Sequence, residues 1–242
     1  MRDATHLLAT DLDGTLVGSK EGLESLLTYY KSQPYEVTLV YITGRHLLSV
    51  LELIEEEHLP KPELLITDVG TKIFEGKTLK LDQDWQKKME KSWEPERVKM
   101  VAAKFEGLIP QNIAVDTRLS FHVSNDDELV HAFDRQLNRE GISHKLIYSS
   151  GKDVDILPPD SGKGEALKYI VETYGYSDAN LMVAGDSGND LEMLSIGYPA
   201  VVVGNAQKEL VTELRDTDSI YRAKAECAGG ILEAWEHFYG QH

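Results

Sequence analysis

The feature that most constrains the fold is the alternation of apolar, strand-like runs with helical patterns along most of this 242-residue chain. The strand-like runs are continuously apolar, which is typical of strands that are covered on both faces in a parallel sheet. They are residues 6–10, 37–42, 63–67, 180–184 and 200–203. The helical patterns that follow or precede them are residues 22–32, 46–58, 164–175, 190–197 and 207–216. This order predicts an α/β fold with a doubly wound, mostly parallel sheet.

The middle of the chain interrupts this alternation. It is more charged, and its strand-like runs alternate between apolar and polar side chains, as in a small open sheet with one exposed face. The helical patterns cover roughly 94–106 and 126–139. The strand-like runs cover 117–123 and 144–150, and 152–157 is a candidate for a third. We therefore expect an inserted α+β domain at 82–157 within a core formed by 1–81 and 158–242. Pro158 and Pro159 would stiffen the return to the core.

Charge and composition exclude some classes of partner. The formal net charge is −16, which argues against binding to nucleic-acid backbones or anionic membranes, since both need clustered Lys and Arg. No run approaches the roughly 20 apolar residues of a membrane span, and the first residues lack the pattern of a signal peptide. A single cysteine, Cys227, is expected to be a small buried residue and fits a reducing compartment. We expect a cytoplasmic protein.

Four polar clusters stand where predicted strands end or a helix begins. They are "DLDGT" from Asp11, "TGR" from Thr43, Lys163, and "GDSGND" from Gly185. In an open α/β sheet, ligands bind beyond the carboxyl ends of the strands. Each cluster alone is also an ordinary turn or helix cap. Lys163 is harder to explain in that way, because a cation in the first helical turn opposes the helix dipole unless it meets an anion.

Together, the clusters suit phosphoryl transfer. Asp11, Asp186 and a main-chain carbonyl near Asp13 would offer the hard oxygen ligands that Mg²⁺ prefers. A carboxylate can attack phosphorus and form an aspartyl-phosphate. Thr43 can donate a hydrogen bond to the phosphoryl oxygens, and Lys163 can balance their charge. Asp13, as a second carboxyl group, can protonate the leaving oxygen and later activate water.

These four clusters resemble the four motifs of the haloacid dehalogenase superfamily of phosphatases. The resemblance spans the whole chain and implies a Rossmann-like core, and the long insert resembles a type 2 cap. It implies that Asp11 is the nucleophile, that Asp13 is the general acid and base, and that Asp186 binds Mg²⁺. Asp190 would support the metal or Lys163.

The predicted site residues fall into three groups. The predicted catalytic residues are Asp11, Asp13, Thr43 and Lys163. The predicted metal-binding residues are Asp11, Asp13, Asp186 and Asp190. The predicted phosphate-binding residues are Thr43, Gly44, Lys163 and Asn189.

Longer stretches are similar to the sucrose-phosphate phosphatase family. They are "YITGR" from Tyr41, "TDVGTKIF" from Thr67, "SSGKDVDILP" from Ser149, "GNAQKEL" from Gly204 and "AGGILEAWEHF" from Ala228. This similarity implies Mg²⁺-dependent hydrolysis of sucrose 6-phosphate. Relatives that act on mannosyl-3-phosphoglycerate or glucosylglycerol phosphate share the core motifs, so another sugar phosphate is the alternative. A non-catalytic partner of a glycosyl-phosphate synthase is a third hypothesis. The expected partners are a phosphorylated sugar and a sucrose-phosphate synthase, and we expect a monomer.

The stretch "SSGKDVD" is the main candidate for recognition of the sugar. It is either an exposed turn around Gly151 or a polar cluster that faces the core. Strand alternation places Asp153 and Asp155 on one face and Lys152 with Val154 on the other. The predicted sugar-binding residues are Ser150, Lys152, Asp155, His122 and Arg45.

Overall fold

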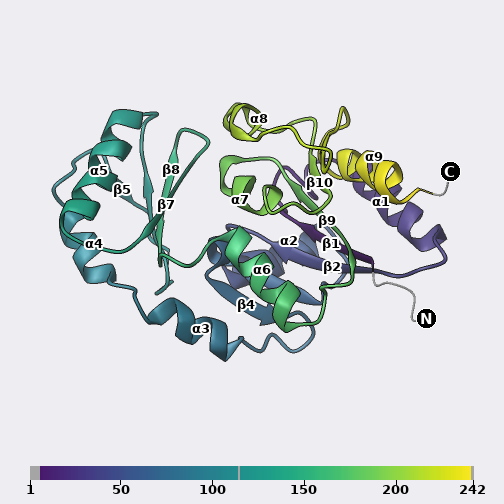
Figure 1. The fold of residues 1–242 in the computed structure, drawn as a ribbon, viewed down its shortest axis with the longest axis horizontal. Helices are drawn as coiled ribbons and strands as arrows, with labels where there is room; N and C mark the ends of the chain where they lie inside the picture. Colours follow the sequence, from purple (N-terminus) through teal and green to yellow (C-terminus); the bar gives the residue numbers. More distant parts are fainter. Residues whose placement is uncertain (1–5, 114, 241–242) are drawn as a thin grey trace.

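The computed structural model of the chain describes residues 6–113 and 115–240, and these form two sheets (Figure 1). The larger sheet has the strand order β11-β10-β9-β1-β2-β3-β4, and its neighbours are parallel except for β3 and β4. Its strands are β1 (His6–Thr10), β2 (Val37–Ile42), β3 (Leu64–Thr67), β4 (Lys72–Glu75), β9 (Asn180–Gly185), β10 (Ala200–Val202) and β11 (Ile220–Arg222). This confirms the predicted doubly wound, mostly parallel α/β fold.

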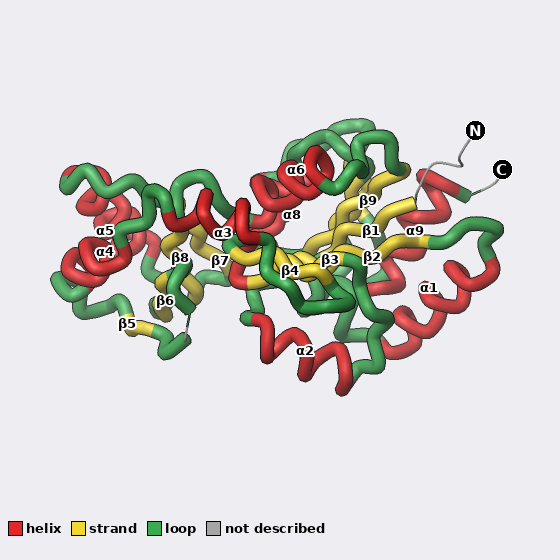
Figure 2. Tube along the Cα trace, turned by 90° about the horizontal axis from the view of Figure 1, so that it is seen from below, coloured by secondary structure: helices red, strands yellow, loops and turns green. Residues whose placement is uncertain are grey.

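Helices bury an apolar layer on each face of this sheet (Figure 2). On one face lie α1 (Lys20–Ser32), α2 (Leu47–Glu56) and α9 (Cys227–Tyr239). On the other lie α3 (Gln83–Glu90), α6 (Lys163–Thr173), α7 (Leu191–Leu194) and α8 (Lys208–Glu213). Because both faces are covered, the central strands are apolar throughout, which is why their sequences do not alternate. Within the part of the chain that the structure describes, no helix has the length and apolarity to cross a bilayer.

The smaller sheet is antiparallel, with the order β5-β6-β8-β7. Its strands are β5 (Ile109–Pro110), β6 (Leu119–His122), β7 (Lys145–Ser149) and β8 (Asp153–Leu157), and its helices are α4 (Pro95–Ala102) and α5 (Asp127–Arg139). Phe121, Phe133 and Val154 belong to the separate apolar core of this unit. We call this sheet with α4 and α5 the cap; it lies on the left in Figure 1, beside the larger sheet.

The sequence analysis did not predict several elements. β4, β11 and α9 were absent from it, and the helix expected at 94–106 ends at Ala102. α3 was not separated from the predicted insert, although Trp85 and Met89 are fully buried in the core cluster. The core–cap boundaries stay a prediction, and this packing favours a first boundary after α3.

The return from the cap to the core passes very close to η1 (Asp68–Gly70). A Cβ atom on Gly70 would lie 2.3 Å from the carbonyl carbon of Gly162, so no side chain fits there. Both glycines also have positive φ angles, +91° and +107°, which other residues rarely adopt. Lys163 follows immediately as the first residue of α6. This close crossing therefore sets where Lys163 enters the core.

Candidate active site

The polar clusters meet at one edge of the larger sheet, because β9, β1 and β2 are neighbours and run parallel. Asp11 follows β1, Thr43 follows β2 and Asp186 follows β9. The backbone continues the ladder for one more residue at two of these ends. The N–H of Asp11 donates to Ala184 O (3.0 Å), and that of Thr43 donates to Ile66 O (2.8 Å). The backbone of Asp11 and of Thr43 is thus held by the neighbouring strand.

Lys163 joins two of the carboxylates. Its ammonium group lies 2.6 Å from Asp11 Oδ1 and 2.7 Å from Asp190 Oδ1, and its side chain is fully buried. Burial alone would lower the pKa of Lys163, but the two carboxylates raise it overall, so the ammonium form is favoured. The other oxygen of Asp190 accepts the backbone N–H groups of Asp186 and Ser187 (3.0 and 3.1 Å). Both oxygens of Asp190 are therefore engaged.

Asp11, Asp186 and Asp190 form a buried acidic cluster in which carboxylate oxygens lie within 4.8 Å of one another. Burial raises the pKa of Asp11 well above its usual range; Lys163 opposes this shift, and Asp190 and Asp186 add to it. Burial, followed by the charge of Asp190, raises the pKa of Asp186 to about 6. Thr15 donates a hydrogen bond of 2.8 Å to Asp186. Such crowded, desolvated carboxylates are the donor set that a hard divalent cation requires.

Asp13 lies in a different environment from Asp11. Its side chain is 52% exposed, and both of its oxygens accept hydrogen bonds from Arg45, each at 2.7 Å. Arg45 also donates to Ser49 Oγ (2.9 Å). The carboxylates that raise the pKa of Asp11 are those of Asp190 and Asp186, so the crowding in this site comes from β9 and the residues after it.

A cleft of about 280 Å³ lies between these core loops and the cap. Four of the predicted residues line it: Gly44, Arg45, Asp155 and Asn189. Asp153 lines it too, as expected from its position two residues before Asp155. Within the described chain, Asn189 Oδ1 is buried and has no hydrogen-bond partner, although it lies beside the cleft.

The remaining predicted sugar-binding residues are not among those that line the cleft. Ser150 and Lys152 are exposed at the turn between β7 and β8, and Ser149 lines the cleft instead. His122 is 58% exposed and lies 3.0 Å from Asp153. The roles of Ser150, Lys152 and His122 stay predictions.

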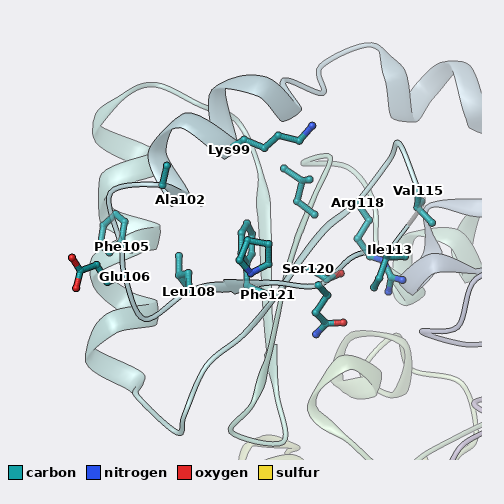
Figure 3. Close-up of a pocket in the computed structure, with 14 residues that line it drawn as sticks. Lys99, Ala102, Phe105, Glu106, Leu108, Ile113, Val115, Arg118, Ser120 and Phe121 are labelled. Atoms are coloured by element: carbon teal, nitrogen blue, oxygen red, sulfur yellow. The ribbon is translucent and has the colours of Figure 1, made fainter.

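A second cavity, of about 550 Å³, lies within the cap and is shown in Figure 3. Its walls are largely apolar and include Phe105 and Phe121. Gln111, Ile113 and Arg118 line both this cavity and the cleft. Arg118 lies at the end of the cavity that is nearest the core (Figure 3).

Two residues that shape the site were not found from the sequence. Asn205 donates to Gly14 O (2.7 Å) and accepts the N–H of Cys227 (2.8 Å), so it holds the loop after β1 against the start of α9. It lies in the "GNAQKEL" stretch, which had been singled out without a role for this residue. The sequence around Arg118 contains no motif that indicates a role for this residue at the site. Cys227 is buried, as expected.

The fold is that of the haloacid dehalogenase class. A haloacid dehalogenase-like hydrolase from Bacillus subtilis has the same fold, with a TM-score of 0.67 at 19% identity over 99% of this chain and 94% of that one. The family model of sucrose-6F-phosphate phosphohydrolase matches residues 4–239. The chain therefore belongs to this family, which confirms the resemblance noted from the sequence.

Relatives of known name are similar over nearly the whole chain. The crystal structure of the sucrose-phosphatase from Synechocystis in complex with sucrose and phosphate has a TM-score of 0.90 and 34% identity over 97% of this chain and 98% of that one. Probable sucrose-phosphatase 2 of Arabidopsis thaliana is 34% identical over 96% of this chain, which spans 59% of that relative's length. Mannosylfructose-phosphate phosphatase of Agrobacterium fabrum is 29% identical over 96% of both chains.

Proposed function

We propose that this chain is a Mg²⁺-dependent phosphatase that hydrolyses sucrose 6-phosphate to sucrose and phosphate through an aspartyl-phosphate. The observation that carries the proposal is the buried Lys163–Asp11–Asp190 cluster beside Asp186. These four residues do not line the cleft between core and cap, but Asn189, next to Asp190, does. The choice of substrate is supported by the 34% identical Synechocystis enzyme, which holds sucrose and phosphate.

The proposed reaction has two displacements at phosphorus. In the first, an oxygen of Asp11 bonds to phosphorus, the bond from phosphorus to the sugar oxygen breaks, and Asp13 gives the leaving oxygen a proton. In the second, water attacks the aspartyl-phosphate, the bond from phosphorus to Asp11 breaks, and Asp13 takes up the proton. Because Arg45 engages both oxygens of Asp13, this ion pair must open for Asp13 to reach the leaving group.

The chain's own groups would hold the phosphoryl oxygens and balance their charge. Lys163 supplies an ammonium group within contact of Asp11, and Thr43 supplies a hydroxyl group at the end of β2. Phosphoryl transfer depends mainly on such positioning and electrostatic stabilisation.

Mg²⁺ would be held by carboxylate oxygens of Asp11 and Asp186 and by the main-chain carbonyl of Asp13. When bound, it would neutralise negative charge on the phosphoryl group and so allow a carboxylate to approach it. The raised pKa values of Asp11 and Asp186 support this assignment, because both carboxylates lack full compensation for their charge without a cation. Asp190, whose oxygens are engaged by Lys163 and by backbone N–H groups, would position Lys163.

Other functions have specific support. The mannosylfructose-phosphate phosphatase matches 96% of this chain and favours a second phosphorylated disaccharide as the alternative substrate. A glucosylglycerol-phosphate synthase of Pseudomonas anguilliseptica is 33% identical over 96% of this chain but only 30% of its own length, so a segment of this kind also occurs within a larger synthase. Binding to a sucrose-phosphate synthase, a monomeric state and a cytoplasmic location stay predictions.

A phosphate-release assay with a panel of substrates tests the proposal. The panel contains sucrose 6-phosphate, mannosylfructose phosphate and glucosylglycerol phosphate, each with and without Mg²⁺. We expect the highest kcat/KM for sucrose 6-phosphate. A higher value for another ester would reassign the substrate, and the absence of release from every ester would favour a non-catalytic role.

A further inference from the structure

The loop Thr43–Arg45, which carries two of the proposed phosphate-binding residues, is held by hydrogen bonds at all three of its carbonyl groups. The N–H of Val69 donates to Thr43 O (3.1 Å), and the N–H of Asp68 donates to Arg45 O (2.9 Å). Between them, Arg118 Nη1 donates to Gly44 O (2.8 Å). A peptide whose carbonyl is fixed on one side presents its N–H on the other. The peptide whose carbonyl Arg118 holds carries the N–H of Arg45, which donates to Thr43 Oγ1 (3.1 Å). The Arg118 bond therefore helps to orient the hydroxyl group of Thr43, one of the two proposed phosphate-binding residues of the loop.

Of these three donors, only Arg118 comes from the cap, at the residue before β6. Its guanidinium also lies 3.5 Å from Asp68 Oδ1 in the core and 3.8 Å from Asp155 Oδ1 in the cap. The neighbouring Thr117 is buried, and its hydroxyl lies 2.9 Å from that of Thr71 in the core. The Arg118 side chain thus spans the boundary between the two units, next to a second contact that Thr117 makes with the core.

Arg118 is also unusually buried for a cation at such a boundary. Its side chain is only 6% exposed, and its Nε–H has no hydrogen-bond partner among residues 6–113 and 115–240. Its core partner, Asp68, has a positive φ angle of 55°, and Val69 has one of 57°, so the turn that meets it is strained. Long, charged side chains are rarely buried without a specific role, and this one reaches the loop that the proposed phosphoryl group would contact.

We propose that Arg118 is a positioning residue that couples closure of the cap to the shape of the phosphoryl-binding loop. This inference rests on the proposed function of the loop. When the cap is closed, Arg118 fixes Gly44 O and completes the set of bonded carbonyls. When the cap opens, the loop loses that bond while Asp68 and Val69 keep theirs. Phosphoryl binding and cap closure then favour each other, as linkage requires.

The test compares Arg118→Ala, Arg118→Lys and the matched control Arg135→Ala in the full chain. Arg135 is exposed on α5, so the control removes the same charge from the cap without touching the loop. Calorimetry with inorganic phosphate in the presence of Mg²⁺ measures the dissociation constant. We expect Arg118→Ala to raise it about tenfold, which is a typical size for coupling between sites. The dissociation constant of Arg118→Lys should lie between those of the wild type and Arg118→Ala. Lysine keeps the positive charge but lacks the planar set of N–H donors of the guanidinium group.

A second measurement separates positioning from a structural role. Millimolar guanidinium added to Arg118→Ala should restore part of the phosphate affinity, and it should not change the affinity of the wild type or of Arg135→Ala. Unchanged phosphate binding by folded Arg118→Ala would overturn the inference, as would a loss without any rescue. Since phosphate binding needs no ester, a wild type that binds phosphate but hydrolyses nothing in the panel would refute the proposed function and still leave this comparison decisive.

Discussion

Asp11 and Asp13 are separated by one residue, yet the fold gives them opposite surroundings. Asp11 is buried against Lys163 and shares its pocket with Asp186 and Asp190, whereas Asp13 is half exposed and paired with Arg45. The bend after β1 causes this difference, because Leu12 O accepts the N–H groups of Thr15 and Val17 and turns the chain back on itself. Two carboxyl groups in distinct environments can take distinct chemical roles.

Replacing Asp11 by Asn should abolish turnover and leave the fold intact. An amide cannot form the acyl phosphate as a carboxylate does, while its size and shape are nearly the same. Phosphate release should fall to background, and circular dichroism should match the wild type. Full activity in the purified variant would remove Asp11 as the nucleophile.

Replacing Asp13 by Asn should slow the reaction most for poor leaving groups. A sugar alkoxide needs a proton as it leaves, whereas nitrophenolate barely needs one. The measurement is the ratio of kcat/KM for sucrose 6-phosphate to that for p-nitrophenyl phosphate, which should fall in the variant. Equal losses on both substrates would count against Asp13 as the general acid.

At the scale of single elements, the turn between β7 and β8 carries the predicted sugar contact of Lys152. Lys152 is exposed there and is not among the residues that line the cleft. The prediction is that its side chain hydrogen-bonds a bound sugar, and a hydrogen bond from a charged group contributes roughly 1.5–3 kcal/mol.

Lys152→Ala should therefore lower kcat/KM for the sugar phosphate by about ten- to a hundredfold and leave p-nitrophenyl phosphate nearly unaffected. Lys91→Ala, at an exposed lysine after α3, is the matched control. No loss on either substrate would assign this stretch to an ordinary surface turn, and equal loss on both would indicate a role in folding or closure.

Several elements followed directly from local sequence. β1 and β2 have the predicted bounds, because each is a continuous apolar run that ends at a polar cluster. β4 was missed because four residues after a 3-10 turn carry no periodic signal, and its pairing with β3 is a tertiary event. α9 was not assigned as a helix; its start contains Gly229 and Gly230, which are poor helix formers.

The core part of the site could be predicted better than the cap part for a similar reason. The groups at the ends of β1, β2 and β9 are adjacent in any sheet of this order, so local patterns suffice to bring Asp11, Thr43 and Asp186 together. Arg118 meets Gly44 across 74 residues of sequence, and no local pattern specifies that contact. Packing between units decides such contacts.

At the scale of the whole molecule, the acidic cluster links stability to pH and to metal. The folded pKa of Asp186 is about 6, above the ordinary value of about 3.9, and Asp11 is shifted in the same direction. Between about pH 4 and pH 6 these two carboxyl groups then hold more protons in the folded chain than in the unfolded chain. Their contribution to the free energy of unfolding of the metal-free protein should therefore fall as pH rises through this window, which the difference between wild type and Asp186→Asn measures.

Mg²⁺ should reverse this loss, because it binds the ionised carboxylates of the folded state. Thermal unfolding with Mg²⁺ and with EDTA should show a gain in Tm that is larger near pH 7 than near pH 5. Asp186→Asn should flatten the pH dependence and reduce the gain. A Tm that is the same with Mg²⁺ and EDTA at both pH values would contradict the metal assignment, as would activity that survives dialysis against EDTA.

The contact between Gly70 and Gly162 also determines how this architecture can be re-engineered. The chain re-enters the core at Gly162, one residue before Lys163. It passes Gly70 there so closely that a side chain on Gly70 would clash with the backbone of Gly162. A foreign cap transplanted onto this core would have to rejoin upstream of Gly162 and keep both glycines, or it would displace the lysine along with the linker. Chimeras joined before that point should exchange substrate preference while keeping the chemistry, and those joined after it should lose both.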